Sequence, residues 1–207
     1  MKKNDIKIVK VEPILMKGTR WYKAWNFVRI YTEQGIEGIG EGFSWGGGNI
    51  DSPQKIFEEP VDANQPERLK PIADSTSIPI AVGENICTRE EAKKVFDTEA
   101  IEIIQPELGT NGGILESFKV SAMAEVYNVK VSTHNWCGPI VTLAASHLCA
   151  AIPNLLYQEY ASTAPEDSWE KEFLEPPIRI ENGEIVLSDS PGLGVKINEK
   201  LLEDRRL

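Results

Sequence analysis

The sequence predicts an α/β protein, with parallel strands alternating with helices through the middle of the chain and antiparallel hairpins near both ends. From about residue 51, short apolar runs recur between segments with helical patterning, which is typical of βα units in a parallel sheet or barrel. Nearer the ends, apolar residues alternate with polar ones, as in strands with one buried face. We therefore divide the 207 residues into segments 1–50, 51–165 and 166–207.

The first segment is predicted to form an antiparallel hairpin or meander. Residues 6–15 ("IKIVKVEPIL") and 25–33 ("WNFVRIYTE") both alternate apolar with polar or charged side chains. The "EQG" at residues 33–35 supplies turn residues before "IEGIGEGF".

The middle segment contains five apolar runs, predicted to be buried strands, and helical stretches between them. Thr88 followed by Glu91 is a capping-box pattern, which predicts that a helix begins at "TREEAKKVF". Two further helices are predicted at "GGILESFKVSAMAEVY" and "PIVTLAASHLCAAI". The five apolar runs are "KIF", "IPIAV", "AIEIIQ", "VKVST" and "LLYQ".

The last segment returns to hairpin character. Its "IRIENGEIVL" contains Asn182-Gly183, a dipeptide that favours the tight turns of hairpins. We expect this tail to pack with the amino-terminal region.

A carboxylate or an imidazole follows each apolar run, at intervals of about one βα unit. Because the carboxyl ends of parallel strands meet at one mouth in a barrel, these side chains are expected to converge there. Clustered carboxylates repel one another and take up protons unless a cation holds them, and Mg²⁺ prefers such oxygen ligands. The residues are Glu58 with Glu59, Glu84, Glu107, His134 and Glu159.

Each of these residues alone has a structural alternative. A glutamate at a strand end is usually solvated surface, and a lone histidine is more often a hydrogen-bonded loop residue than a catalyst. Their common register favours a site. By contrast, His147 lies within an apolar helical stretch and is interpreted as a packed core residue. The two histidines are 13 residues apart and form no H-E-x-x-H motif, which argues against a zinc hydrolase. The glycine-rich stretches do not complete a nucleotide-binding motif.

Composition excludes several function classes. The formal net charge of −10 argues against nucleic acid or an anionic membrane as a partner. The cysteines Cys87, Cys137 and Cys149 form no C-x-x-C pair or disulfide pattern, and the amino terminus has neither a signal-peptide core nor a spanning segment. We expect a cytoplasmic protein that binds a small molecule or a cation.

In order along the chain, "IFEEPV", "IPIAVGENI", "IEIIQPELGTNGGI", "VSTHNWCGP", "LLYQEY" and "DSPGLGV" resemble landmarks of the enolase superfamily, in particular the mandelate racemase group that includes acid-sugar dehydratases. The resemblance implies a partial (β/α) TIM-type barrel, made of the last five strands, with remnants of an α+β capping domain from both chain ends. Residues around "MKGTRWY" correspond to the capping loop that confers specificity in the family.

The resemblance also implies residue roles. Glu58 and Glu84 correspond to the second and third Mg²⁺ ligands, His134 to the catalytic histidine and Glu107 to its acidic partner, where the family usually has Asp. Glu159 corresponds to an acid that stabilises the intermediate or positions substrate. The implied chemistry is proton abstraction alpha to the carboxylate of a sugar acid, as in a dehydratase or racemase.

The landmarks of the first three βα units are missing, and with them a Lys-x-Lys motif and the first Asp ligand. The sequence therefore resembles a family member with an internal deletion near residues 44–60, and we expect weak Mg²⁺ binding. The alternative is a catalytically inactive remnant or an oligomeric assembly module. A five-stranded part of a barrel has open edges. We expect a homo-oligomer, or a sheet edge capped by the amino-terminal hairpin.

Overall fold

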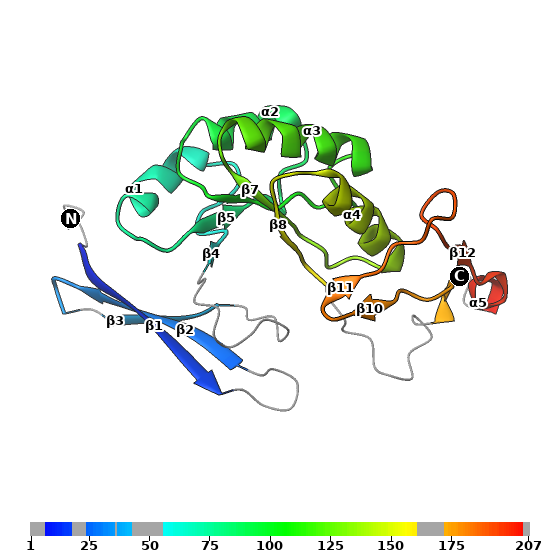
Figure 1. The fold of residues 1–207 in the computed structure, drawn as a ribbon. Helices are drawn as coiled ribbons and strands as arrows, with labels where there is room; N and C mark the ends of the chain where they lie inside the picture. Colours follow the sequence, from blue (N-terminus) through cyan, green and yellow to red (C-terminus); the bar gives the residue numbers. More distant parts are fainter. Residues whose placement is uncertain (1–6, 18–23, 36, 43–55, 161–171, 205–207) are drawn as a thin grey trace.

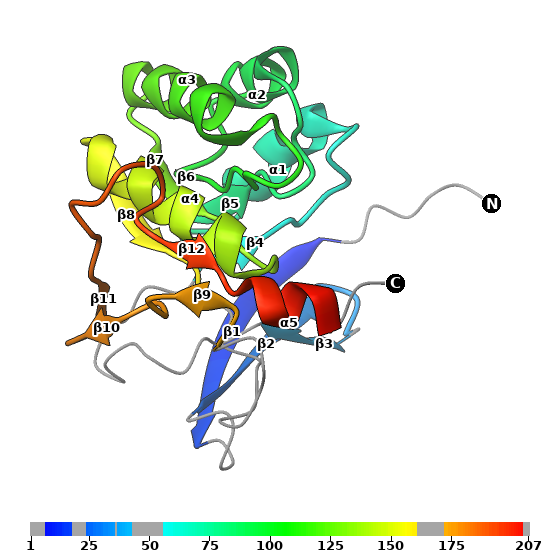
Figure 2. The same ribbon diagram turned by 90° about the vertical axis from the view of Figure 1, so that its right-hand side faces the viewer.

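The computed structural model describes residues 7–17, 24–35, 37–42, 56–160 and 172–204. Most of the predicted specificity loop lies outside these ranges, and so do residues 44–55 of the region where the deletion is expected. Helices cover one face of a parallel sheet, and smaller antiparallel sheets lie on its other side (Figure 1). A view turned by 90° agrees, since α2 and α3 again lie away from the amino-terminal strands (Figure 2).

The amino-terminal strands form the predicted meander. Strands β1 (Ile8–Lys17), β2 (Ala24–Thr32) and β3 (Glu37–Gly42) pair antiparallel in that order. The turn before β3 is closed by the Gly35 N–H, which donates to the Thr32 carbonyl at 3.0 Å. Gly35 has a φ of +76°, which glycine adopts without steric cost.

All five predicted strands of the middle segment are present, and they form one parallel sheet. The strands are paired in chain order, β4-β5-β6-β7-β8, as in a continuous part of a barrel wall. The strands are β4 (Phe57–Glu58), β5 (Ile80–Val82), β6 (Ile103–Ile104), β7 (Lys130–Thr133) and β8 (Leu155–Gln158).

The three predicted helices are also present, as α2 (Arg89–Phe96), α3 (Gly113–Val126) and α4 (Pro139–Ala151). The capping box is confirmed: the Glu91 N–H donates to Thr88 Oγ1 at 3.2 Å, and the Thr88 N–H donates to Glu91 Oε2 at 3.0 Å. The sequence analysis missed the short helices η1 (Pro66–Arg68) and α1 (Leu69–Ala73), which are too brief to show a helical period.

The hydrophobic core lies between the helices and the sheet. Ile80, Val82, Ile104 and Val131 from the strands pack in one cluster with helix residues such as Phe96. None of these residues is more than 4% exposed. This packing fixes which face of each strand points towards the helices, because successive side chains of a strand alternate between faces.

The opposite face of the central strands is covered within the single chain. By alternation, Ala81, Ile103 and Ser132 lie on this face, and they are only 0%, 3% and 0% exposed. The middle of this face is therefore buried within the single chain.

The edge of the sheet is different. The prediction that "KIF" forms a buried strand is wrong, because β4 is an edge strand and Phe57 is 38% exposed. Among the described residues, no strand pairs with the outer side of β4, so the amino-terminal meander does not extend the sheet. The homo-oligomer stays a prediction.

The tail forms the predicted hairpin, but in a different place from the one expected. Strands β10 (Ile180–Glu181) and β11 (Glu184–Ile185) pair across Asn182 and Gly183, which both have positive φ as a type I′ turn requires. The tail's strands pair with each other rather than with β1–β3, and Figure 1 shows its final elements at the other end of the molecule. The remaining elements are β9 (Leu174–Glu175), β12 (Lys196–Ile197) and α5 (Glu199–Asp204).

Within the described ranges, no helix is both long and apolar enough to cross a membrane.

Candidate active site

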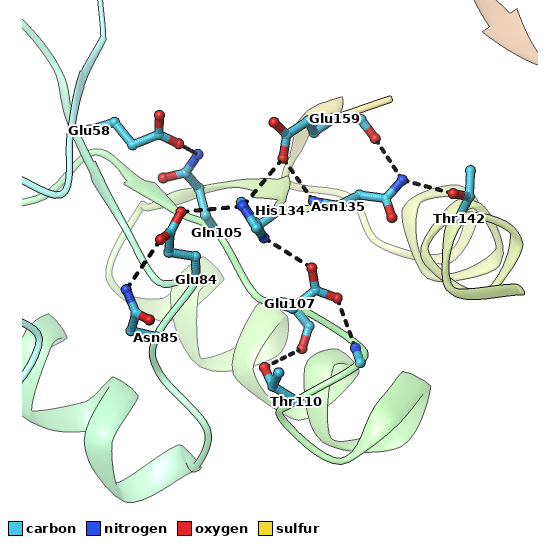
Figure 3. A network of polar contacts seen from close by, with 11 residues as sticks. Glu58, Glu84, Asn85, Gln105, Glu107, Thr110, His134, Asn135, Thr142 and Glu159 are labelled. Carbon is cyan, nitrogen blue, oxygen red and sulfur yellow. Dashed lines mark hydrogen bonds and ion pairs between the residues drawn. The ribbon is translucent and has the colours of Figure 1, made fainter. Parts of the chain in front are cut away.

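The polar side chains that follow the five strands gather at the carboxyl ends of the sheet, as predicted (Figure 3). Glu58 is the last residue of β4, and His134 and Glu159 directly follow β7 and β8. Glu84 and Glu107 come from the loops after β5 and β6. The parallel pairing of the strands brings these five residues together from across about half of the chain.

His134 lies among three carboxylates. Its Nδ1 is 2.9 Å from Oε2 of Glu107, the residue that the resemblance gives as its acidic partner. Its Nε2 is 3.2 Å from Glu84 Oε2 and 3.9 Å from Glu159 Oε2. An ionised carboxylate can only accept, so the contact with Glu107 places a hydrogen on Nδ1. Carboxylates beside both nitrogens favour the doubly protonated imidazolium.

Glu107 is buried, with only 4% of its surface exposed, and its carboxylate is fully engaged. Its Oε1 accepts the Gly109 N–H at 2.8 Å, while Oε2 faces His134. Burial tends to raise the pKa of Glu107, but hydrogen bonds from His134, the Gly109 N–H and the Cys137 thiol outweigh it and hold the pKa below its ordinary value of 4.5. The ion is therefore kept charged at neutral pH.

The pKa of His134 is raised above its ordinary value of 6.5. Burial is the largest single influence and lowers the pKa, but the hydrogen bond to Glu107 and the charges of Glu159, Glu84 and Glu107 together outweigh it. Near neutral pH this environment holds a proton on the ring, as a proton donor requires.

Glu159 is fixed by Asn135, a residue that the sequence analysis missed. The Asn135 N–H donates to Glu159 Oε2 at 2.7 Å, and Asn135 Nδ2 donates to the Glu159 carbonyl at 3.2 Å and to Thr142 Oγ1 of α4 at 2.9 Å. Asn135 is 1% exposed. The only signal in the sequence was an asparagine beside His134, which is also common in ordinary turns.

The two adjacent glutamates after β4 point to different partners. Glu58 Oε1 accepts from Gln105 Nε2 at 2.6 Å, whereas Glu59 Oε1 accepts the Gly83 N–H at 2.6 Å. Burial, more than the charges of Glu84 and Glu58, raises the pKa of Glu59 against the opposing effect of the Gly83 bond. Glu59 thus ties β4 to β5, and Glu58 remains exposed at the mouth.

Gly83 holds the ends of β5 and β6 close together. A Cβ at this position would lie 2.6 Å from the Gln105 backbone nitrogen, and Gly83 has a φ of +142°. Only glycine meets both conditions without strain. The close approach places Glu84, the next residue, beside the end of β6.

The donor chemistry at the mouth fits a hard divalent cation in part. Glu58 and Glu84 come from adjacent strand ends and lie on the same side in Figure 3. Among the described residues, neither forms an ion pair with Lys or Arg. Within these residues there is no group of three or more His, Cys, Asp or Glu side chains that could hold a metal ion. Mg²⁺ is commonly held by one or two carboxylates with water completing its shell, so the pair suits weak Mg²⁺ binding.

The sequence profile of a family described as "Enolase C-terminal domain-like" matches residues 53–201, which include all five of these strands. The chain belongs to the enolase superfamily. This confirms the resemblance seen in the sequence, and the family's TIM-barrel-type α/β fold accounts for the parallel sheet with its covering helices.

Relatives of this enolase-superfamily chain include sugar-acid dehydratases. It is 34% identical over 147 residues to D-xylonate dehydratase of Haloferax volcanii, covering 71% of this chain and 35% of that protein. It is 39% identical over 155 residues to D-galactonate dehydratase of Pectobacterium atrosepticum, covering 72% and 40%. The chain thus matches less than half of the length of these relatives.

Solved structures show the same likeness. An enolase-superfamily member from Salmonella Typhimurium superposes with a TM-score of 0.66 at 32% identity, over 72% of this chain and 38% of that one. The mandelate racemase/muconate lactonizing enzyme of Jannaschia sp. CCS1 matches with a TM-score of 0.66 at 16% identity, over 97% of this chain and 98% of that one. This second likeness concerns the fold alone, and it extends over the amino-terminal strands.

Proposed function

We propose that this chain carries the histidine half of an acid-sugar dehydratase site and binds a sugar acid together with Mg²⁺. The observation that supports this most directly is the position of His134, whose Nδ1 lies 2.9 Å from Glu107 and whose Nε2 lies 3.2 Å from Glu84. Relatives named D-galactonate and D-xylonate dehydratase give the substrate class.

In this proposal His134 is the general acid. Loss of water from a sugar acid removes the proton alpha to the carboxylate and expels the neighbouring hydroxyl, which must be protonated as it leaves. His134 holds the required proton on Nε2, while Glu107 fixes the ring through Nδ1 and stabilises the imidazolium. Glu159 also lies on the Nε2 side of the His134 ring, with its Oε2 3.9 Å from Nε2. There it orients a substrate hydroxyl or the proton on Nε2.

Glu58 and Glu84 would hold the cation, and when bound it would neutralise the substrate carboxylate and so acidify the alpha proton. The sequence has no counterpart of the family's Lys-x-Lys base or of the first Asp ligand. We therefore expect this chain to bind a sugar acid but to turn it over slowly or not at all.

A non-enzymatic assembly module is the second candidate. It is favoured by the outer side of β4, which has no strand partner among the described residues and leaves Phe57 38% exposed. An open edge with an apolar side chain can pair with another chain. In this case His134 and its carboxylates are inherited from an active ancestor and bind nothing.

Calorimetric titration with D-galactonate, D-gluconate and D-xylonate, with and without Mg²⁺, separates the two candidates. The proposal expects Mg²⁺-dependent binding that Glu84→Gln and His134→Asn each weaken by about tenfold or more. Glu125→Gln, at an exposed position on α3, is the matched control and should leave binding unchanged. Absence of sugar-acid binding by the wild-type chain would favour the assembly module.

Turnover is measured in parallel from the 2-keto acid that dehydration forms. We expect none at ordinary enzyme rates of ~1–10³ per second. Turnover at such a rate, abolished by His134→Asn, would show that the lysine motif is dispensable and would overturn the incomplete-site part of the proposal.

A further inference from the structure

The Gln105 side chain lies between the carboxylates of Glu58 and Glu84 (Figure 3). It follows β6 directly, and only 6% of the residue is exposed. Its Nε2 donates to Glu58 Oε1 at 2.6 Å. Its Oε1 is buried and has no hydrogen-bond partner among the residues that the structure describes.

A buried acceptor without a donor is unfavourable, and such groups in native proteins call for a physical explanation. The amide lies between two carboxylates in Figure 3; Glu84 faces His134 Nε2 at 3.2 Å, whereas Glu58 has no ion pair among the described residues. A cation between Glu58 and Glu84 would offer this oxygen a partner once the amide has turned over.

The amide can reach such a cation without movement of the backbone. The terminal torsion of glutamine is broad and roughly two-fold, so a half-turn exchanges Oε1 and Nε2. Without a cation, the NH₂ group faces Glu58 because the carboxylate needs a donor. With a cation bound, the NH₂ group would be repelled and the oxygen attracted.

The backbone at Gly83 keeps Gln105 within range of Glu84. Because a Cβ at Gly83 would lie 2.6 Å from Gln105 N, the two strand ends approach as closely as glycine permits. Glu84 directly follows Gly83. The spacing between a carboxylate from β5 and an amide from β6 is therefore set by the sheet itself.

We propose that Gln105 is a third protein oxygen ligand of the cation held by Glu58 and Glu84, with its amide turning over when the cation binds. This inference rests on the proposed function, because it requires that the two glutamates bind a cation at all. It gives the chain three protein oxygens from three adjacent strands, β4, β5 and β6, in place of the missing Asp ligand.

The test measures the affinity of the folded chain for Mg²⁺ alone by calorimetry and for Mn²⁺ alone by electron paramagnetic resonance. Gln105→Leu removes the oxygen and should weaken binding by about tenfold or more, whereas Gln105→Glu retains an oxygen and should bind at least as tightly as the wild type. Gln158→Leu, a glutamine at the end of β8 that donates to the Thr142 carbonyl, is the matched control and should stay within about twofold. Circular dichroism checks that each variant is folded.

The outcomes distinguish this inference from the proposed function. If Glu84→Gln abolishes binding and Gln105→Leu leaves it unchanged, the cation site stands and Gln105 is not a ligand. If Glu58→Gln and Glu84→Gln both leave binding unchanged, the cation site is wrong and this inference is overturned with it.

A measurement on the wild-type chain covers the case in which Gln105→Leu does not fold. In ¹³C- and ¹⁵N-labelled protein, saturating Mg²⁺ should shift the Gln105 Cδ resonance. It should also shift the resonances of the Gln105 NH₂ group, because that group loses its hydrogen bond to Glu58. If Mg²⁺ saturably shifts the Glu84 resonances and leaves those of the Gln105 amide in place, the inference is refuted.

Discussion

Replacing Glu107 by Gln tests whether the contact with His134 is an ion pair that contributes to stability. The substitution preserves shape but removes the charge, and it turns one of the two carboxylate oxygens into an NH₂ group. One of two donors, the Gly109 N–H at 2.8 Å or the His134 ring nitrogen at 2.9 Å, must then face another donor. A hydrogen bond to a charged group contributes ~1.5–3 kcal/mol, and a buried group left unsatisfied costs ~1–3 kcal/mol. We therefore expect Glu107→Gln to lower the free energy of unfolding by about 3–5 kcal/mol.

The pH dependence of this loss identifies its cause. The pKa of Glu107 is lowered from 4.5, so its contribution is fully present above pH 4.5 and is lost as the pH falls through the folded value. The pKa of His134 is raised from 6.5, so its contribution is fully present below pH 6.5 and is lost as the pH rises through the folded value. The difference between wild type and variant should be largest between pH 4.5 and 6.5 and shrink on both sides.

The assay is urea unfolding followed by far-ultraviolet circular dichroism at pH values below, within and above this window. Glu125→Gln, which removes one exposed negative charge from an acidic chain, corrects for the general change in net charge. A stability difference that is the same at every pH would refute the ion pair. A difference under about 1 kcal/mol would show that Glu107 is not held as the structure describes.

Two further substitutions test the backbone that positions the site, again by urea unfolding. Gly83→Ala and Gly113→Ala both place a side chain at a positive φ, which costs ~1–3 kcal/mol of strain. Gly83→Ala should lower the free energy of unfolding more, because only its Cβ would lie 2.6 Å from Gln105 N. Equal losses would mean that β6 moves away freely. Thr88→Ala removes the acceptor for the Glu91 N–H and should lower the free energy of unfolding by about 1 kcal/mol. Thr88→Ser keeps a hydroxyl acceptor and should retain most of the wild-type stability. Equal losses in the two variants would argue against the cap.

The sequence by itself determined the five strands of the parallel sheet, the helices α2, α3 and α4, the hairpins near the two ends and the residues that meet at the mouth. Period-two and helical patterns depend on local alternation of apolar and polar side chains, and the cap at Thr88 depends on residues four positions apart or fewer. The convergence of Glu58, Glu84, Glu107, His134 and Glu159 could also be predicted, because the carboxyl ends of parallel strands lie at one edge whatever the details of packing.

Only the tertiary structure decided which polar partners hold those residues. Gln105 lies 47 residues from Glu58 along the chain, and Asn135 lies 24 from Glu159, yet each pair is joined by a hydrogen bond. Nothing local distinguishes such an amide from one in an ordinary turn. The exposed edge at Phe57 and the buried far face at Ile103 were equally out of reach, because burial depends on which elements cover a strand. Local sequence fixes the periodicity of an element, whereas contacts between distant residues depend on how the whole sheet is assembled.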